Sequence, residues 1–153
     1  MASLIKSGIP LQKYEHFEPQ KDMPILLQAI IGHDNTHFAL KQFFKEILSR
    51  GPEIIVVTNG SEGVYAATKE AIYFHPSLKE KVVSTLGAGD AFGSCFVASL
   101  AQNKSIPEAL VRGTINATSV IKFLDAKTGL LTQDALEKQA KTIGIRLIQK
   151  FKL

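Results

Sequence analysis

The stretch Thr85-Leu86-Gly87-Ala88-Gly89-Asp90-Ala91-Phe92 decides how this sequence is read. It follows a brief β-branched run at residues 82–85 and precedes an apolar stretch that continues to about residue 102. We therefore expect a strand, a glycine turn and a helix over residues 90–102 that is buried all round. Three small residues at the start of a helix leave unpaired N–H groups pointing outward, and such groups make an anion site.

Asp90 falls in the first turn of this expected helix, beside the anion site. The helix dipole favours a carboxylate at that place. Such a carboxylate can accept the proton of a hydroxyl group that attacks a bound phosphoryl group. The residues alone leave a second interpretation open, in which Asp90 only complements the dipole and the glycines only form a tight turn.

A second glycine motif lies upstream, directly after the β-branched residues 53–58, which are typical of a short strand buried on both faces. Glycines at the C-terminal end of a strand let backbone N–H groups approach a phosphate closely. The same motif also makes a good turn between two strands, so both interpretations stay open. Its residues are Thr58, Asn59, Gly60, Ser61, Glu62 and Gly63.

The remaining pattern predicts helices on both sides of these motifs. Residues 34–50 place apolar side chains on one helical face, and Ser105 and Glu108 have the spacing of a capping box that begins a helix running to about Leu124. A last helix from about Gln133 carries an apolar stripe that continues to Leu147.

Two further strands are expected at residues 64–68 and 71–75, joined by a two-residue turn. The order of elements predicts a layered α/β domain over residues 34–153, with helices packed on a mostly parallel sheet. Residues 1–33 show no clean periodicity and are expected to form an irregular arm.

Composition narrows the classes of protein to consider. The 153 residues are 45% apolar and 21% charged, which is typical of one folded globular domain. The single cysteine, Cys95, excludes a disulfide scaffold and is expected in the core. The apolar residues 24–31 fall far short of the ~20 needed to cross a bilayer, so we expect a cytoplasmic protein without a membrane partner.

The net charge of +4 is concentrated near the C-terminus, where residues 137–153 hold five basic side chains and one acid. They could form a patch for nucleic acid or the solvated face of a last helix. No aromatic residue is interleaved before Phe151, which favours the solvated face, so no nucleic-acid partner is expected. His33 and His37 have helical spacing but no third ligand, and no protein metal site is expected.

With these motifs the sequence resembles the ribokinase/PfkB family of carbohydrate kinases. The resemblance is carried by residues 85–92, by the glycine motif at residues 58–63 upstream and by Asn116-Ala117-Thr118-Ser119 downstream. Order and spacing match from about Asp34 to Leu136. The sequence departs from the family pattern at three places. Met23-Pro24-Ile25-Leu26 stands where the family usually has Asn-x-x-Glu, Ser84 stands where an acid is frequent, and Asp125 stands where glycine is common.

The resemblance implies ATP-dependent phosphorylation of a sugar or nucleoside hydroxyl group. Asp90 would then be the catalytic base, and the Thr58–Gly63 motif would line the phosphate side of the nucleotide site. Asn116 would lie near the adenine, and Mg²⁺ would enter with ATP, held mainly by phosphates and water. The anion hole would be formed by the backbone of Gly87, Ala88 and Gly89.

Members of this family are commonly about twice as long, so the chain resembles the C-terminal, nucleotide-binding half of such a kinase. We expect a homo-oligomer, or a partner that supplies the half with most of the sugar site, because half of such a domain leaves a sheet edge uncovered. The alternative is a non-catalytic remnant or interaction module that folds, with or without ATP binding.

Overall fold

The computed structural model describes residues 36–153, which divide into two compact units. One unit contains residues 36–56, the turn at residues 67–71 and the last two residues; the other contains residues 57–66 and 72–151. The expected arm of residues 1–33 lies outside the described residues.

The first helix is α3, Thr36–Ser49, within the segment that the periodicity predicts. Four apolar side chains on one face are buried: Leu40, Phe44, Ile47 and Leu48. This face follows the spacing i, i+4, i+7, i+8 of an amphipathic helix. The helix ends where Gly51 adopts a positive φ, just before Pro52.

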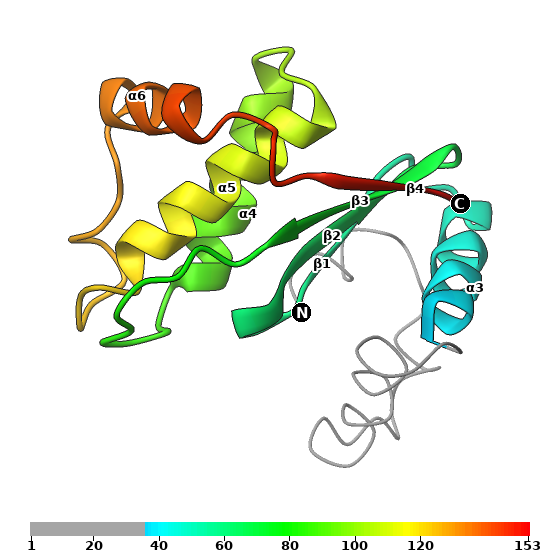
Figure 1. Cartoon of the computed structure of the whole chain (residues 1–153), viewed down its shortest axis with the longest axis horizontal. Coiled ribbons are helices and arrows are strands. Elements are labelled where there is room, and N and C mark those ends of the chain that lie inside the picture. The colour runs from blue at the N-terminus through cyan, green and yellow to red at the C-terminus, as the bar shows by residue number, and fades with distance from the viewer. Residues whose placement is uncertain (1–35) are drawn as a thin grey trace. The chain divides into compact units, whose positions relative to one another are not determined.

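Four strands form one sheet in the order β1-β2-β3-β4 (Figure 1). The strands are β1 (Ile55–Thr58), β2 (Gly63–Ala67), β3 (Ala71–Pro76) and β4 (Gln149–Lys152). Neighbours in sequence are neighbours in the sheet, and the sheet is antiparallel. The expectation of a mostly parallel sheet is therefore not confirmed in the described residues, because short turns join β1 to β2 and β2 to β3.

Side chains also link the neighbouring strands. The rings of Tyr65 on β2 and Phe74 on β3 lie 4.6 Å apart, and Lys150 on β4 lies over the Tyr73 ring at 5.4 Å. Cross-strand contacts of this kind contribute to sheet stability and set the register. β1 is at the edge of the sheet, so its residues are half-buried rather than buried on both faces as expected.

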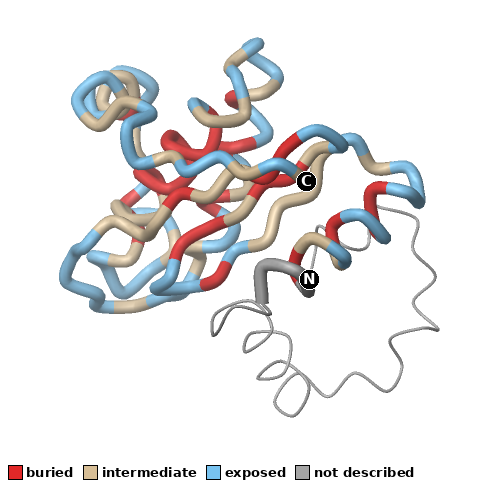
Figure 2. Tube along the Cα trace, turned by 45° about the vertical axis from the view of Figure 1, so that its right-hand side comes forward, coloured by how far each residue is buried: buried red, intermediate tan, exposed pale blue. Residues whose placement is uncertain are grey.

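The helices of the second unit form a layer in which α4 packs on α5 and α5 packs on α6 (Figure 1). These are α4 (Ala88–Ala101), α5 (Ile106–Val120) and α6 (Gln133–Ile143). Their shared core is a cluster of Cys95, Val111, Ile115 and Leu136. Figure 2 shows the buried stretches of the chain in red. Cys95 is thus a core residue, as expected.

Residues 82–85 are not a strand, contrary to expectation. The N–H groups of Val83 and Ser84 both donate to the single carbonyl of Ile121, at 2.8 and 3.2 Å, instead of joining a ladder. A β-branched composition favours a strand only where a partner strand is in reach. The following helix, α5, ends at Val120, earlier than the expected Leu124.

The last helix is also shorter than expected. It ends at Ile143, because Gly144 takes a positive φ at its C-terminus, and Leu147 lies beyond it. The chain then forms β4, which the sequence pattern did not predict. The basic segment of residues 137–153 therefore includes the end of α6 and the whole of β4, and it is not one solvated helical face.

The remaining difference concerns α4. This helix is apolar almost all round in sequence, yet only its inner face is buried, and Val97 is 64% exposed.

None of the helices in residues 36–153 is both long and apolar enough to span a membrane.

Candidate functional site

The N-terminus of α4 is open. Gly87 is its N-cap, with φ 78° and ψ −3°, and no side chain caps the helix. Ala88 donates to the carbonyl of Thr85, and Ala91 is the residue that donates back to Gly87, at 2.8 Å. The N–H groups of the first turn have no partner one helical turn back, so those of Gly89 and Asp90 remain available to an anion.

Gly89 is exposed, and a Cβ at this position would meet no atom within 4 Å. The space outside the first turn is therefore free for a ligand. Asp90 is also exposed, and no hydrogen bond or ion pair of its carboxylate is found within residues 36–153. Its backbone carbonyl accepts from the hydroxyl of Ser94 at 2.7 Å. The motif thus presents donors and a carboxylate in one turn.

Gly87 cannot be replaced by a residue with a side chain. Its positive φ is in the region that favours glycine, and a Cβ there would collide with the Cβ of Ala126 and lie 3.0 Å from its Cα. The turn that begins α4 is therefore pressed against the loop that follows α5. In the sequence, this loop after α5 stood out by one residue, Asp125, which stands where glycine is common in the family.

The Thr58–Gly63 motif forms a turn of 3₁₀-helix, Gly60–Glu62, between β1 and β2. Asn59 donates to the carbonyl of Gly63 at 2.8 Å, and Glu62 donates back to Asn59 at 3.0 Å. Gly60, Ser61 and Glu62 are exposed, whereas Asn59 and Gly63 are buried. A Cβ on Gly63 would collide with the carbonyl oxygen of His75, so the glycine is needed for the turn itself.

Both motifs belong to the second compact unit. In Figure 1 the 3₁₀ turn is at the lower end of the sheet and α4 begins at the lower end of the helical layer. The upstream motif therefore forms the turn that one interpretation expected, and Gly60, Ser61 and Glu62 are exposed in it.

Asn116 is buried, and both ends of its amide are engaged. Its Nδ2 donates to the carbonyl of Ala91 at 3.0 Å, and its Oδ1 accepts from the N–H of Leu131 at 3.1 Å. It thus connects α5 to the first turn of α4 and to the segment before α6. A contact with adenine stays a prediction, and the geometry by itself gives Asn116 a positioning role.

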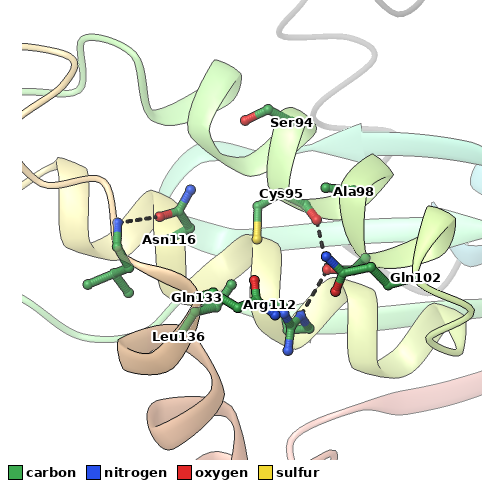
Figure 3. A pocket seen from close by; sticks show the side chains of 10 residues that line it. Ser94, Cys95, Ala98, Gln102, Arg112, Asn116, Gln133 and Leu136 are labelled. Carbon is green, nitrogen blue, oxygen red and sulfur yellow. Dashed lines mark hydrogen bonds between the residues drawn. The ribbon is translucent and has the colours of Figure 1, made fainter.

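A cavity of about 260 Å³ lies between α4, α5 and α6 (Figure 3). Asn116 lines it, but no residue of either glycine motif does. The sulfur of Cys95 points into it, and burial raises the pKa of this thiol. Such a thiol is a poor nucleophile at neutral pH, which agrees with a core role.

Arg112 is the buried charge in this region, and the sequence pattern did not single it out. It is 3% exposed; its Nε donates to Ser99 at 3.0 Å, and its Nη1 donates to Glu137 at 2.7 Å. The guanidinium lowers the pKa of the Glu137 carboxyl. One side chain therefore joins α4, α5 and α6. The sequence gives no sign of this link, because a single arginine within a helix is usually exposed.

Residues 27–132 match the family model of the pfkB family carbohydrate kinases. The chain is 32% identical over 103 residues to a ribokinase of Lactococcus lactis, which covers 67% of this chain and 34% of that protein.

Two solved structures are similar. A ribokinase of Thermotoga maritima matches with a TM-score of 0.59 and 28% identity, covering 71% of this chain and 40% of that one. The Arabidopsis thaliana ribokinase, solved with ribose and ATP, matches with a TM-score of 0.62 and 23% identity, covering 67% and 33%.

The chain spans about a third of the length of the curated relatives it matches. The match covers both glycine motifs and Asn116, and ends just before α6. The sequence motifs, the fold and the family model agree, and the chain belongs to the pfkB family of carbohydrate kinases.

Proposed function

We propose that this chain carries the phosphoryl-transfer centre of an ATP-dependent kinase acting on a hydroxyl group of a sugar or nucleoside. One observation carries the proposal: the N-terminus of α4 is uncapped and open at Gly89, and Asp90 stands exposed in the same turn. Membership of the family supports the reaction class, and the open turn supports the location.

In this proposal Asp90 accepts the proton of the substrate hydroxyl group as its oxygen attacks the γ-phosphorus of ATP. A new P–O bond forms to the substrate, the bond to the β-phosphate oxygen breaks, and ADP leaves. The Gly87–Gly89 turn stabilises the charge on the transferred group through its free N–H groups, since that of Ala88 already donates to Thr85. The helix dipole favours negative charge at the same place.

The nucleotide would lie along the second motif. The exposed position of Gly60, Ser61 and Glu62 supports a contact on the phosphate side, and Asn116 would act near the adenine. The uncapped helix start fits a polyphosphate carrying Mg²⁺, because it offers N–H groups that no side chain caps. Mg²⁺ would be held mainly by phosphates and water, and would neutralise phosphate charge.

The binding step is tested by calorimetric titration of the purified chain with Mg-ATP. Gly89→Val puts an isopropyl group into the open space above the first turn, with no atom to clash with. Binding by the wild-type chain and its loss in Gly89→Val are expected. Gly93→Ala is the matched control, since this glycine lies one turn further along α4 and also has free space. A folded wild-type chain that fails to bind would contradict the nucleotide site.

The transfer step is tested by a panel of sugars and nucleosides with radiolabelled ATP. Loss of a general base typically costs 10²–10⁴-fold, so Asp90→Asn is expected to reduce turnover by about that factor while Mg-ATP affinity changes little. Unchanged turnover in Asp90→Asn would refute its role as base. Saturable ATP binding without turnover of any substrate would favour the non-catalytic alternative.

The sugar pocket is expected to be completed by a second chain or by further kinase sequence. The exposed outer face of α4 and the half-buried edge strand β1 support self-association. Light scattering of the purified chain measures this directly. A dimer or larger assembly is expected, and a monodisperse monomer would count against it.

A further inference from the structure

The loop between α5 and α6 carries a side chain that is outside the proposed centre but acts on its geometry. Asp125 Oδ1 accepts from the N–H groups of Lys127 and Thr128, both at 2.8 Å, and its Oδ2 accepts from the Thr128 hydroxyl at 2.6 Å. Its carboxylate thus closes a turn around Ala126, which lies between Asp125 and Lys127. Three hydrogen bonds from one side chain fix the backbone of the turn.

This turn lies against the start of α4. Gly87 approaches Ala126 so closely that a Cβ on Gly87 would be 3.0 Å from the Ala126 Cα. On the other side, Val83 and Ser84 donate to the carbonyl of Ile121, which begins the same loop. The residues before the glycine turn and Gly87 itself are therefore both held by residues 121–126.

The direction of the first N–H groups of α4 depends on the dihedral angles of Gly87. These angles are positive in φ and are open to a glycine over a wide range, so contacts must fix them. Ala126 supplies that contact, and the Asp125 turn holds Ala126 in place. An error of about 1 Å in the position of such donors can cost up to about 10²-fold in rate.

We propose that Asp125 is a positioning residue for the proposed phosphoryl site, because its turn seats Ala126 on Gly87 and so aims the free N–H groups at the start of α4, that of Gly89 above all. The inference rests on the proposed function. Hydrogen bonds from Thr128 and Lys127 hold the pKa of the Asp125 carboxyl at about 2, so the turn stays formed at any pH where a kinase works. Asp125 does not itself touch the substrate.

The test compares three variants in this loop. Asp125→Ala removes all three hydrogen bonds, whereas Asp125→Asn keeps the Oδ1 acceptor and places a donor against the Thr128 hydroxyl. Lys127→Ala is the matched control, because its side chain is exposed and its backbone N–H remains. The Ala and Asn variants lose the same negative charge, so a difference between them reports the turn and not the charge.

The first measurement is the ¹H–¹⁵N correlation spectrum of the whole chain. In Asp125→Ala the amide signals of Gly87 and Gly89 are expected to move, and in Asp125→Asn and Lys127→Ala they are expected to stay close to the wild type. Unmoved glycine signals in Asp125→Ala would overturn the proposal. This measurement needs no nucleotide, so it is independent of the proposed function.

The second measurement is the affinity of each variant for Mg-ADP and for a non-hydrolysable Mg-ATP analogue. Asp125→Ala is expected to weaken the ATP analogue about tenfold and to leave ADP within about twofold, because the N–H groups face the transferred phosphoryl group. A general loss of stability would weaken both nucleotides equally, and that result would overturn a positioning role. Tighter ATP binding would show that the charge of Asp125 dominates, which also overturns it.

If no nucleotide binds to the wild type while the glycine signals move as expected, the proposed function fails and the structural link between Asp125 and Gly87 stands. If nucleotides bind and the glycine signals do not move, only the positioning role fails.

Discussion

The helices α4 and α5 lie side by side and show opposite relations between sequence and burial. α4 is apolar almost all round, yet its outer residues Val97 and Ala101 are exposed. α5 contains an arginine, a threonine and an asparagine that are all buried. The reason is position: α5 has α4 and α6 as neighbours, whereas α4 has α5 on its inner face. Burial follows the layer in which a helix lies, and composition alone does not decide it.

The N-termini of α4 and α5 also differ, in how their first turns are capped. The N-cap of α5, Ser105, accepts from Glu108 and completes a capping box, which satisfies the first turn internally. The N-cap of α4, Gly87, has no side chain to offer. A closed terminus stabilises the fold, and an open terminus leaves donors for a ligand. The comparison therefore separates a structural helix start from a candidate binding site.

The largest effect is expected from Arg112→Ala on α5. It removes the charge that joins three helices and leaves Glu137, which is 33% exposed, without its partner. Breaking a buried hydrogen-bond and ion-pair network costs up to about 3 kcal/mol, and here the cost comes from the packing and hydrogen bonds of Arg112, because Glu137 stays solvated. Urea unfolding measures this loss. Arg112→Met, which keeps most of the volume, is expected to lose less, and a loss below about 1 kcal/mol in Arg112→Ala would contradict the role of this link.

A smaller effect is expected from Asn116→Leu. The leucine has a similar size but leaves the N–H of Leu131 without its acceptor and removes the donor to Ala91. An unsatisfied half-buried donor and a lost hydrogen bond together cost about 2 kcal/mol. Thermal or urea unfolding gives the value, with Thr118→Ala on the same helix as control. Equal stability of both variants would show that Asn116 does not hold the two helices together.

The closed terminus of α5 gives the third prediction. Ser105→Ala is expected to cost about 1 kcal/mol of stability at neutral pH. The hydrogen bonds from Ser105 lower the pKa of Glu108, so their contribution is present above the ordinary value of 4.5 and is lost as the pH falls through the lowered value. Wild-type stability should therefore fall in acid more steeply than that of Ser105→Ala. Parallel pH curves for the two proteins would be evidence against the capping box.

The smallest change in stability is expected on the exposed face of α4. Val97→Cys in a Cys95→Ala background should differ from Cys95→Ala alone by less than about 0.5 kcal/mol. The new thiol should react with iodoacetamide at least about tenfold faster than Cys95 in the wild type, since burial raises the pKa of Cys95 and covers it. In urea the two rates should converge. Equal rates in the folded proteins would mean that the outer face is covered in solution.

Much of the fold was predictable because its signals are local. The face of α3, the turns at the two glycine motifs and the capping box of α5 are each set by residues within about two turns, and the structure confirms this local geometry. The strand expected at residues 82–85 was wrong, because it required a partner that the sequence could not show. β4 was missed for the same reason, since its pairing with β3 joins residues far apart in the chain.

The residues of the candidate site could be named from the sequence, but the contacts that support them could not. Gly87, Gly89 and Asp90 could be named from their spacing, because a glycine turn before a helix is a local pattern. The support from Ala126 could not be named, because it comes from a loop beyond α5. Asp125 was visible as an unusual residue, and its three hydrogen bonds became visible with the structure.

The sequence by itself determined the family, the glycine turn with its acidic residue, and the order of most helices and strands. These depend on the spacing of residues along the chain, which sets the helix period, the caps and the motifs. The tertiary structure alone decided that the sheet is antiparallel, that Arg112 is buried and that the outer face of α4 is exposed. These depend on which distant segments pack together, and packing is a property of the whole layer and not of any local stretch.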